Sequence, residues 1–268
     1  MGGEGRRCAR EERALAQPVK SSREVFGQRA AFYTHSPAHT DERTLTHLVE
    51  LAAPGREWRA LDLGAGSGHT AFAFALHVAS VMAADVTPEM LAEARRLRDE
   101  RRVRNVRFCL ADAAALPFSA ASFDLVTCRR AAHHFPDLPG ALAEVHRLLR
   151  SGGVFAVDDR SVPEDDFVDV TMNALDRCHD ESHVREYRPS EWRAMLERAG
   201  LALRQVEPYV RHRPLSSLTE GASADNVAAI IALLARLTPE ARALLNLTEV
   251  GGELHINHWY LMLVADKV

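Results

Sequence analysis

Residues 61–68 read Leu61-Asp62-Leu63-Gly64-Ala65-Gly66-Ser67-Gly68, and this stretch decides the predicted fold. An apolar run leads into it and a helical pattern follows it, so a strand should enter a glycine loop and a helix should leave it. Glycines permit a tight turn and let a ligand approach the backbone closely. A dinucleotide fingerprint needs a sixth-position glycine, where this chain has His69. The G-x-G-x-G spacing therefore disfavours a nicotinamide-dependent oxidoreductase.

Short apolar runs alternate with amphipathic helical stretches, which is typical of a parallel sheet with helices on both faces. Strands are expected at 59–63, 81–85, 106–110, 123–128, 154–158, 203–209 and 254–264. Helices are expected at 69–79, 88–101, 138–149, 191–199 and 224–247, with Ser190 as the N-cap of the fourth and a break at Thr238-Pro239 in the last. The predicted fold class is α/β, a doubly wound, mostly parallel seven-stranded sheet with helical lid additions.

The chain is expected to hold one core domain with additions. Residues 1–40 would form an N-terminal leader and helical cap, and residues 41–210 the cofactor-binding core with a lid insertion at 161–188. Residues 211–268 would add helices and the closing strand of the same sheet. Open α/β sheets bind their ligands at the carboxyl ends of the strands, so the functional residues should gather at that edge.

Composition disfavours several functional classes. Apolar residues make up 47% and charged residues 26%, the balance of an ordinary globular protein. The net charge is −4 and the only lysines are Lys20 and Lys267, so no nucleic-acid partner is expected. The apolar runs are too short for a membrane span, and the N-terminus lacks an apolar signal segment. The four cysteines form no C-x-x-C pair, which predicts reduced thiols and a cytoplasmic location.

Three aspartates lie at or near the ends of successive predicted strands. Asp62 precedes the first glycine of the loop, where a carboxylate would repel a pyrophosphate but would suit a cation. S-adenosylmethionine carries both an α-ammonium and a sulfonium. Asp85 can accept hydrogen bonds from two ribose hydroxyls, and Asp112 can accept one from an adenine amino group. Together, in this order, the three predict S-adenosylmethionine as cofactor and S-adenosylhomocysteine as product.

Four stretches carry a family resemblance: LDLGAGSG at 61–68, AADVTPEMLAEAR at 83–95, ADAAALPFSAASFDLVTCRRAAHHF at 111–135 and EVHRLLRSGGVFAVDD at 144–159. The chain resembles the class I S-adenosylmethionine-dependent methyltransferases, and within them the ubiquinone/menaquinone-biosynthesis C-methyltransferase-like family. The resemblance implies a Rossmann-like methyltransferase fold. The variant TCRRAAHHF is similar to a bacterial subgroup whose substrates are unassigned.

The resemblance also implies roles for individual residues. Gly64, Ala65 and Gly66 would line the methionine and ribose portions of the cofactor, and Asp85 would hold the ribose. The remaining cofactor contacts it implies are Val86 and Met90 beside the adenine, Asp112 and Ala113 at the adenine edge, Arg129 beneath the cofactor and Tyr33 closing over it.

His133 and His134 are the candidate catalytic residues, because they follow the fourth strand at the edge where the methyl group should point. An imidazole titrates near pH ~6.5, so either could act as a general base, although positioning of the acceptor is the favoured role and His133 the better base candidate. Arg185 and Tyr187 are expected to bind substrate in a lid over the acceptor pocket. No metal site is predicted, because the spacing of His179 and His183 comes without a third ligand.

The leading hypothesis is methyl transfer to a small-molecule acceptor by a monomer or homodimer. The acceptor atom, carbon, oxygen or nitrogen, stays open. Two alternatives keep the cofactor: an enzyme that catalyses a reaction other than methylation, such as cyclisation, and a non-catalytic cofactor-binding partner of another protein. Formation of S-adenosylhomocysteine would separate these alternatives.

Overall fold

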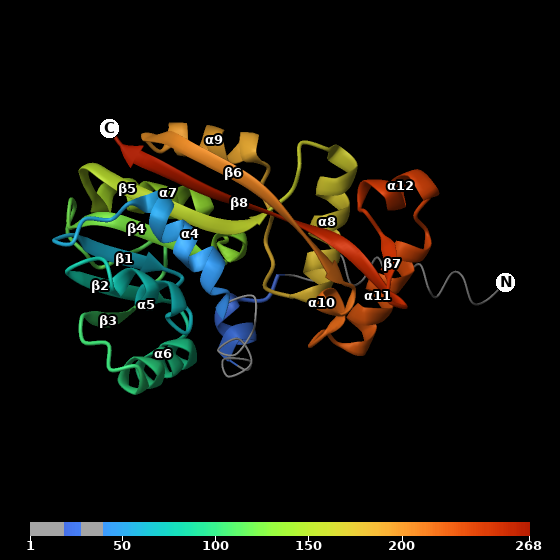
Figure 1. Ribbon diagram of the computed structural model, residues 1–268, viewed down its shortest axis with the longest axis horizontal. Helices are drawn as coiled ribbons and strands as arrows, with labels where there is room; N and C mark the ends of the chain where they lie inside the picture. The colour runs from blue at the N-terminus through green and yellow to red at the C-terminus, as the bar shows by residue number, and fades with distance from the viewer. Residues whose placement is uncertain (1–18, 28–39) are drawn as a thin grey trace.

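The computed structural model describes residues 19–27 and 40–268. Its centre is one sheet in the order β3-β2-β1-β4-β5-β8-β6, with β7 paired to β8 outside this path (Figure 1). The strands are β1 (Arg59–Leu63), β2 (Ser80–Asp85), β3 (Val106–Leu110), β4 (Phe123–Arg129), β5 (Leu149–Ser161), β6 (Leu201–Pro214), β7 (Thr248–Val250) and β8 (Glu253–Lys267).

The first five strands pair in parallel, and β8 runs against both β5 and β6. The order of the strands reverses between β1 and β4, because the chain builds outward from β1 to β3 and then returns to the other side of β1. Such a switch point leaves a crevice at the carboxyl ends of the two strands, where open α/β sheets bind ligands. The glycine loop begins at this crevice.

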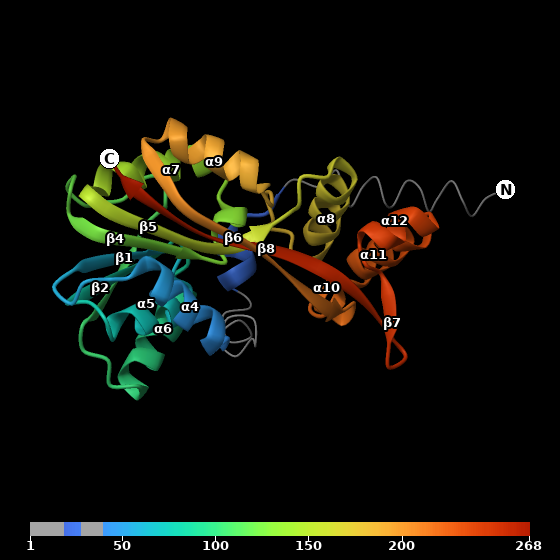
Figure 2. The ribbon, with the colours of Figure 1, turned by 45° about the horizontal axis from the view of Figure 1, so that its top comes forward.

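Helices cover both faces of the sheet (Figure 2). Alternate residues of each strand point to opposite faces: Leu61 and Phe155 belong to one buried cluster, and Ala60 and Ala156 belong to the other. The first cluster packs against α7 (Leu138–Leu148) and α9 (Pro189–Arg198), and the second against α4 (Glu42–Ala52), α5 (His69–Ala75) and α6 (Pro88–Glu100). This alternation fixes which side chains can reach the crevice.

A second group of helices packs beside the carboxyl edge of the sheet. It consists of α8 (Asp166–His179), α10 (Ser216–Thr219), α11 (Ala224–Ala235) and α12 (Pro239–Leu244), and we call it the helical lobe. The lobe has its own buried cluster, which includes Met172, Leu175, Ile230 and Leu234. Strand β8 runs from the sheet into this lobe (Figures 1 and 2). Within the described residues, no helix is long and apolar enough to cross a membrane.

The seven-stranded doubly wound sheet is confirmed, and β7 is an additional short strand that the sequence did not indicate. The helix expected at 69–79 ends earlier, at Ala75. Ser190 is not an N-cap, because α9 begins at Pro189 with Arg188 as its N-cap. Proline favours the first helical position, and the Glu191 carboxylate accepts the Arg188 N–H at 2.9 Å. The Ser190 N–H and hydroxyl instead donate to Glu164.

Candidate active site

The glycine loop after β1 has a backbone conformation that favours glycine. Gly64 and Gly66 have φ angles of +64° and +52°, in the left-handed region. A Cβ at position 64 would also lie 2.5 Å from the Cβ of Ala131, so Gly64 permits the close approach of the segment after β4. The Ala65 N–H donates to the Ala84 carbonyl at 3.0 Å. The loop is thereby held at the ends of β1, β2 and β4.

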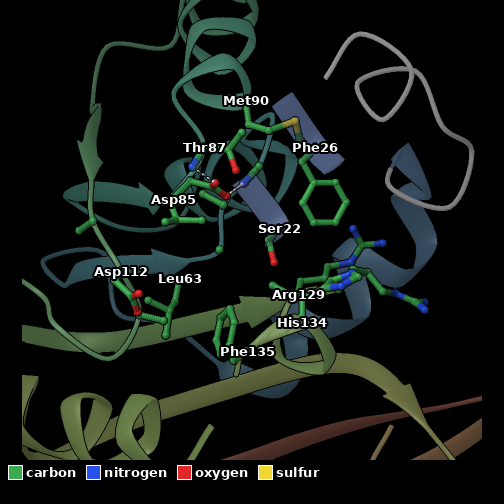
Figure 3. Close-up of a pocket in the computed structure, with 18 of the residues that line it drawn as sticks. Ser22, Phe26, Leu63, Asp85, Thr87, Met90, Asp112, Arg129, His134 and Phe135 are labelled. Atoms are coloured by element: carbon green, nitrogen blue, oxygen red, sulfur yellow. Dashed lines mark hydrogen bonds between the residues drawn. The ribbon is translucent and has the colours of Figure 1, made fainter. Parts of the chain in front are cut away.

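A pocket of about 210 Å³ lies between this loop and the segment after β4 (Figure 3). Its walls include Ser22, Phe26, the end of β2, the segment after β3 and His134 of the short helix η1 (Ala132–His134). The predicted cofactor residues that line it are Gly64, Ala65, Gly66, Asp85, Val86, Met90, Asp112, Ala113 and Arg129. Tyr33 lies outside the described residues. The structure therefore brings most of the predicted cofactor residues to one pocket.

The carboxylate of Asp85, at the end of β2, is held by hydrogen bonds from two backbone N–H groups. One carboxylate oxygen accepts the Gly66 N–H at 2.8 Å and the other accepts the Thr87 N–H at 2.8 Å (Figure 3). Burial raises the pKa of the Asp85 carboxyl, and these two hydrogen bonds oppose the rise. Each oxygen can accept more than one hydrogen bond, so Asp85 retains acceptor capacity.

The wall after β3 is formed by short side chains around Asp112. Asp112 is exposed, and its carboxylate accepts the Ala114 N–H at 2.9 Å in a turn of the chain. Ala113 lines the pocket beside it, and Met90 from α6 lies on a neighbouring wall with Val86. This part of the pocket combines apolar side chains with one exposed carboxylate.

Asp62 is not among the residues that line the pocket. It is 1% exposed, and one of its oxygens accepts the Thr127 hydroxyl at 2.7 Å across the β1–β4 pair. Burial raises the pKa of the Asp62 carboxyl to about 7. The expectation that Asp62 touches a bound cation directly is therefore corrected: strand alternation buries its side chain behind the loop.

Two arginines follow each other at the end of β4 and share a buried carboxylate. The Arg129 Nε donates to Asp158 at 3.0 Å, and the Arg130 Nε lies 3.3 Å from the same carboxylate. The Tyr209 hydroxyl donates to the other oxygen of Asp158 at 2.7 Å. Arg130 has a left-handed φ of +54°, and its guanidinium lies 3.9 Å from the ring centroid of Tyr260. Arg129 and Arg130 line the pocket, and we call this ion-pair group the pocket floor.

His134 lines the pocket and is 7% exposed. Its Nδ1 lies 3.2 Å from the Ser182 carbonyl oxygen and 3.1 Å from the Ser182 hydroxyl oxygen. The ring of Phe26 packs edge-on against it at a centroid distance of 4.9 Å. Burial lowers the pKa of the His134 imidazole to about 4, so the ring is neutral at pH 7.

His133 does not line the pocket, although it was the better base candidate from sequence. Its Nδ1 lies 2.5 Å from Asp159, and its backbone N–H donates to the other oxygen of the same carboxylate at 3.0 Å. Burial opposes ionisation of Asp159, but the neighbouring His133 lowers its pKa. The structure therefore favours His134 over His133 as the histidine that reaches the acceptor, because His133 is paired with Asp159 and does not line the pocket.

Comparison with known proteins decides the family. A family model described as a methyltransferase domain matches residues 61–157. The chain is 38% identical over 219 residues to the uncharacterized methyltransferase YcgJ of Bacillus subtilis (strain 168), covering 81% of this chain and 87% of that one. The crystal structure of YcgJ matches with a TM-score of 0.80 at 36% identity, over 84% of this chain and 98% of that chain. The chain belongs to the methyltransferase family.

Two further relatives have names that state a substrate. A demethylmenaquinone methyltransferase of Thermus thermophilus is 41% identical over 119 residues, covering 44% of this chain and 54% of that protein. The aklanonic acid methyltransferase DauC of Streptomyces sp. (strain C5) is 32% identical over 176 residues, covering 61% of this chain and 76% of that protein. This methyltransferase uses S-adenosylmethionine as its methyl donor.

The residues of the pocket fit that cofactor. Asp85 presents carboxylate oxygens with acceptor capacity left over, as a ribose diol requires, and Met90 and Val86 provide an apolar wall for a nucleobase. Close approach of a ligand to the backbone is possible at Gly66, which carries no side chain. The carboxylate, the apolar side chains and the accessible backbone of the pocket therefore suit the ribose, the adenine and the methionine portions of S-adenosylmethionine.

The predicted substrate residues Arg185 and Tyr187 do not lie in the pocket of this methyltransferase. Arg185 pairs with Asp169 at 3.0 Å and with Glu191 at 2.9 Å, and the Tyr187 ring packs against Trp192 at a centroid distance of 6.1 Å. Acidic side chains from α8 and α9 hold Arg185 away from the crevice. Neither the lid insertion at 161–188 nor residues 211–250 supply a pocket-lining residue.

Sequence reasoning missed several residues of the pocket. Ser22 and Phe26 line it from the N-terminal segment, which was read only as a leader and cap. Phe135 lines it directly after His134 (Figure 3). Phe26 follows Val25 in an otherwise polar stretch, and this apolar pair was the available signal.

The part of the chain that the structure describes holds no cluster of three or more side chains arranged as metal ligands. His179 is the last residue of α8, and His183 lies beyond the helix. The two therefore do not share a helix face, although their i, i+4 spacing would place them on one face if both were helical. His183 Nε2 instead lies 3.0 Å from the Asn173 side-chain oxygen.

Proposed function

We propose that this methyltransferase transfers the methyl group of S-adenosylmethionine to a small-molecule acceptor. The observation that carries the proposal is the pocket at the switch point of the sheet, which Ser22, Phe26 and His134 line together with the glycine loop. A pocket of about 210 Å³ suits a small ligand better than a macromolecule. The names of the Thermus and Streptomyces relatives point to small molecules for those proteins, which supports the same class here.

In this proposal, each wall of the pocket binds a different part of the cofactor. Asp85 accepts hydrogen bonds from the ribose hydroxyls, and the Gly64–Gly66 backbone lies against the ribose and methionine portions. Val86 and Met90 flank the adenine, and Asp112 and Ala113 contact its edge. Arg129, paired with Asp158, lies under the methionine portion. When bound, S-adenosylmethionine supplies an electrophilic methyl group on a cationic sulfur.

The chain contributes alignment and exclusion of water rather than covalent chemistry. Methyl transfer is an in-line displacement, so holding the acceptor in line with the methyl group lowers the barrier. His134 stays neutral at pH 7 and adds no positive charge beside the sulfonium. We assign His134 to positioning the acceptor through a hydrogen bond. His133, with Asp159 behind it, is the second candidate, either as a base or as a support for η1.

The test combines binding with product analysis. S-adenosylhomocysteine should raise the melting temperature, whereas NAD and NADP should leave it unchanged, because only a ligand of the native state stabilises it. Incubation with S-adenosylmethionine and a panel of quinols, phenols and polyketide acids should yield S-adenosylhomocysteine and a product heavier by one methylene. A transformed acceptor without S-adenosylhomocysteine would favour a non-methylating reaction such as cyclisation. Binding without any turnover across the panel would favour the non-catalytic alternative.

A further inference from the structure

The loop at 180–183, between α8 and α9, contacts the pocket through His134. The Ser182 N–H and hydroxyl both donate to one oxygen of Asp180, at 2.9 Å and 2.6 Å. The His134 Nδ1 lies within hydrogen-bond distance of the Ser182 carbonyl and hydroxyl oxygens, at 3.2 Å and 3.1 Å. Asp180, Ser182 and His134 are all buried. The loop thus holds one edge of the imidazole.

These contacts assign the proton on His134. A carbonyl oxygen can only accept, so the Nδ1 that faces the Ser182 carbonyl must carry the hydrogen. The Ser182 hydroxyl gives its own hydrogen to Asp180, and its oxygen is therefore also an acceptor towards Nδ1. A neutral imidazole has one N–H, so Nε2 holds the lone pair.

The other edge of the ring, at Nε2, belongs to a residue that lines the pocket. Among residues 19–27 and 40–268, no group forms a hydrogen bond with the His134 Nε2, and the residue lines the pocket. Phe26 packs against the ring, and Lys20 links the same N-terminal segment to the loop, because its ammonium lies 2.7 Å from Glu181. The ring is therefore held at its Nδ1 edge and against Phe26, and within the described residues its Nε2 is left without a hydrogen-bond partner.

We infer that Asp180 and Ser182 are positioning residues, which hold His134 in the Nδ1–H tautomer so that its Nε2 lone pair accepts a hydrogen bond from the methyl acceptor. The inference rests on the proposed function for the presence of an acceptor in the pocket. It deepens that proposal, because an Nε2 lone pair selects an acceptor group that carries a hydrogen-bond donor, such as a hydroxyl or an amine. Neither residue touches the pocket itself.

The experiment measures the tautomer directly. Protein labelled with ¹⁵N-histidine is examined at pH 7 by long-range ¹H–¹⁵N NMR, with the His134 signals assigned by their loss in His134→Gln. The wild type should show His134 in the Nδ1–H form. Asp180→Asn should raise the Nε2–H fraction, because the Ser182 hydroxyl is then released to donate to Nδ1. Ser182→Ala should raise it less, because it removes one acceptor at Nδ1 but keeps the backbone carbonyl. Ser217→Ala is the matched control, because Ser217 contacts His258 at 3.0 Å and should leave the His134 signals unchanged.

Two outcomes overturn the inference. A wild-type spectrum in the Nε2–H form contradicts the tautomer, and unchanged tautomers in both loop variants, with native-like backbone spectra, contradict the positioning role. Calorimetry with S-adenosylhomocysteine on the same wild-type sample separates the two proposals. Wild-type protein that binds this ligand but carries Nε2–H contradicts the tautomer alone. Wild-type protein that shows Nδ1–H but does not bind it contradicts the proposed function.

Discussion

The two walls of the pocket are built in different ways. The wall at the glycine loop comes from consecutive strand ends, and its key hydrogen bond joins Gly66 to Asp85, 19 residues apart. The wall at η1 is assembled from distant segments: His133 meets Asp159 across 26 residues, and His134 meets Ser182 across 48. The first wall is therefore a property of a local motif, and the second is a property of the whole fold.

The largest effect is expected at the pocket floor. Asp158→Asn leaves two buried guanidinium groups without their carboxylate, so unfolding free energy should fall by about 3–5 kcal/mol. Urea unfolding measures the loss. Asp99→Asn is the matched control, because Asp99 forms an exposed pair with Arg98 and should cost about 0–1 kcal/mol. Equal losses in both variants would show that the buried floor carries no special share of stability.

A substitution in the glycine-loop wall should lower cofactor affinity rather than the stability of the fold. Asp85→Ala removes the proposed acceptor for the ribose hydroxyls, so affinity for S-adenosylhomocysteine should fall by about 1.5–3 kcal/mol, the range for hydrogen bonds to a charged group. Calorimetry measures the change, and Asp99→Ala should bind like the parent. A variant at position 85 with parental affinity would mean that the ribose lies elsewhere.

The buried imidazole of the η1 wall makes stability depend on pH. The pKa of His134 is about 4 in the folded protein and about 6.5 when unfolded, so the unfolded state takes up the proton first as pH falls. Stability is then lost as pH falls from about 6.5 towards 4. Between pH 7 and pH 5 the wild type should lose about 2 kcal/mol more than His134→Gln. Parallel losses in the two proteins, measured by urea unfolding, would place a protonated ring in the folded state.

The smallest effect is expected at the former lid candidates. Arg185 is paired with Asp169 and Glu191 and is 36% exposed, so Arg185→Gln should cost about 0.2–1 kcal/mol of unfolding free energy. The KM for any acceptor identified by product analysis should stay unchanged. A large rise in acceptor KM would return Arg185 to the substrate site and would count against the lining described for the pocket.

The sequence predicted the glycine-loop wall well because its information is local. The loop glycines, Asp85 and Asp112 each lie at or near a strand end that short apolar runs reveal, so their meeting at one edge follows from the topology. Asp62 shows the limit of this reasoning. Its position in the motif suggested ligand contact, but strand alternation turns its side chain to Thr127 instead.

At the η1 wall, the sequence predicted the two histidines, His133 and His134, but not the residues that hold them. Nothing in their local sequence states that Asp159 holds His133 or that Ser182 holds His134, because both partners are distant in the chain. The lid assignment failed for a related reason. The sequence predicts Arg185 and Tyr187 in a lid over the acceptor pocket, whereas α8 and α9 bring acidic and aromatic partners to them.

The central claim is that S-adenosylmethionine lies at the switch point of the sheet, between the glycine loop and η1. A crystal structure of the complex with S-adenosylhomocysteine tests this most directly. We expect both ribose hydroxyls within hydrogen-bond distance of Asp85, the adenine between Met90 and Val86, and the sulfur on the side of His134. A nucleoside bound outside this pocket, or bound within it without contact to Asp85, would contradict the account.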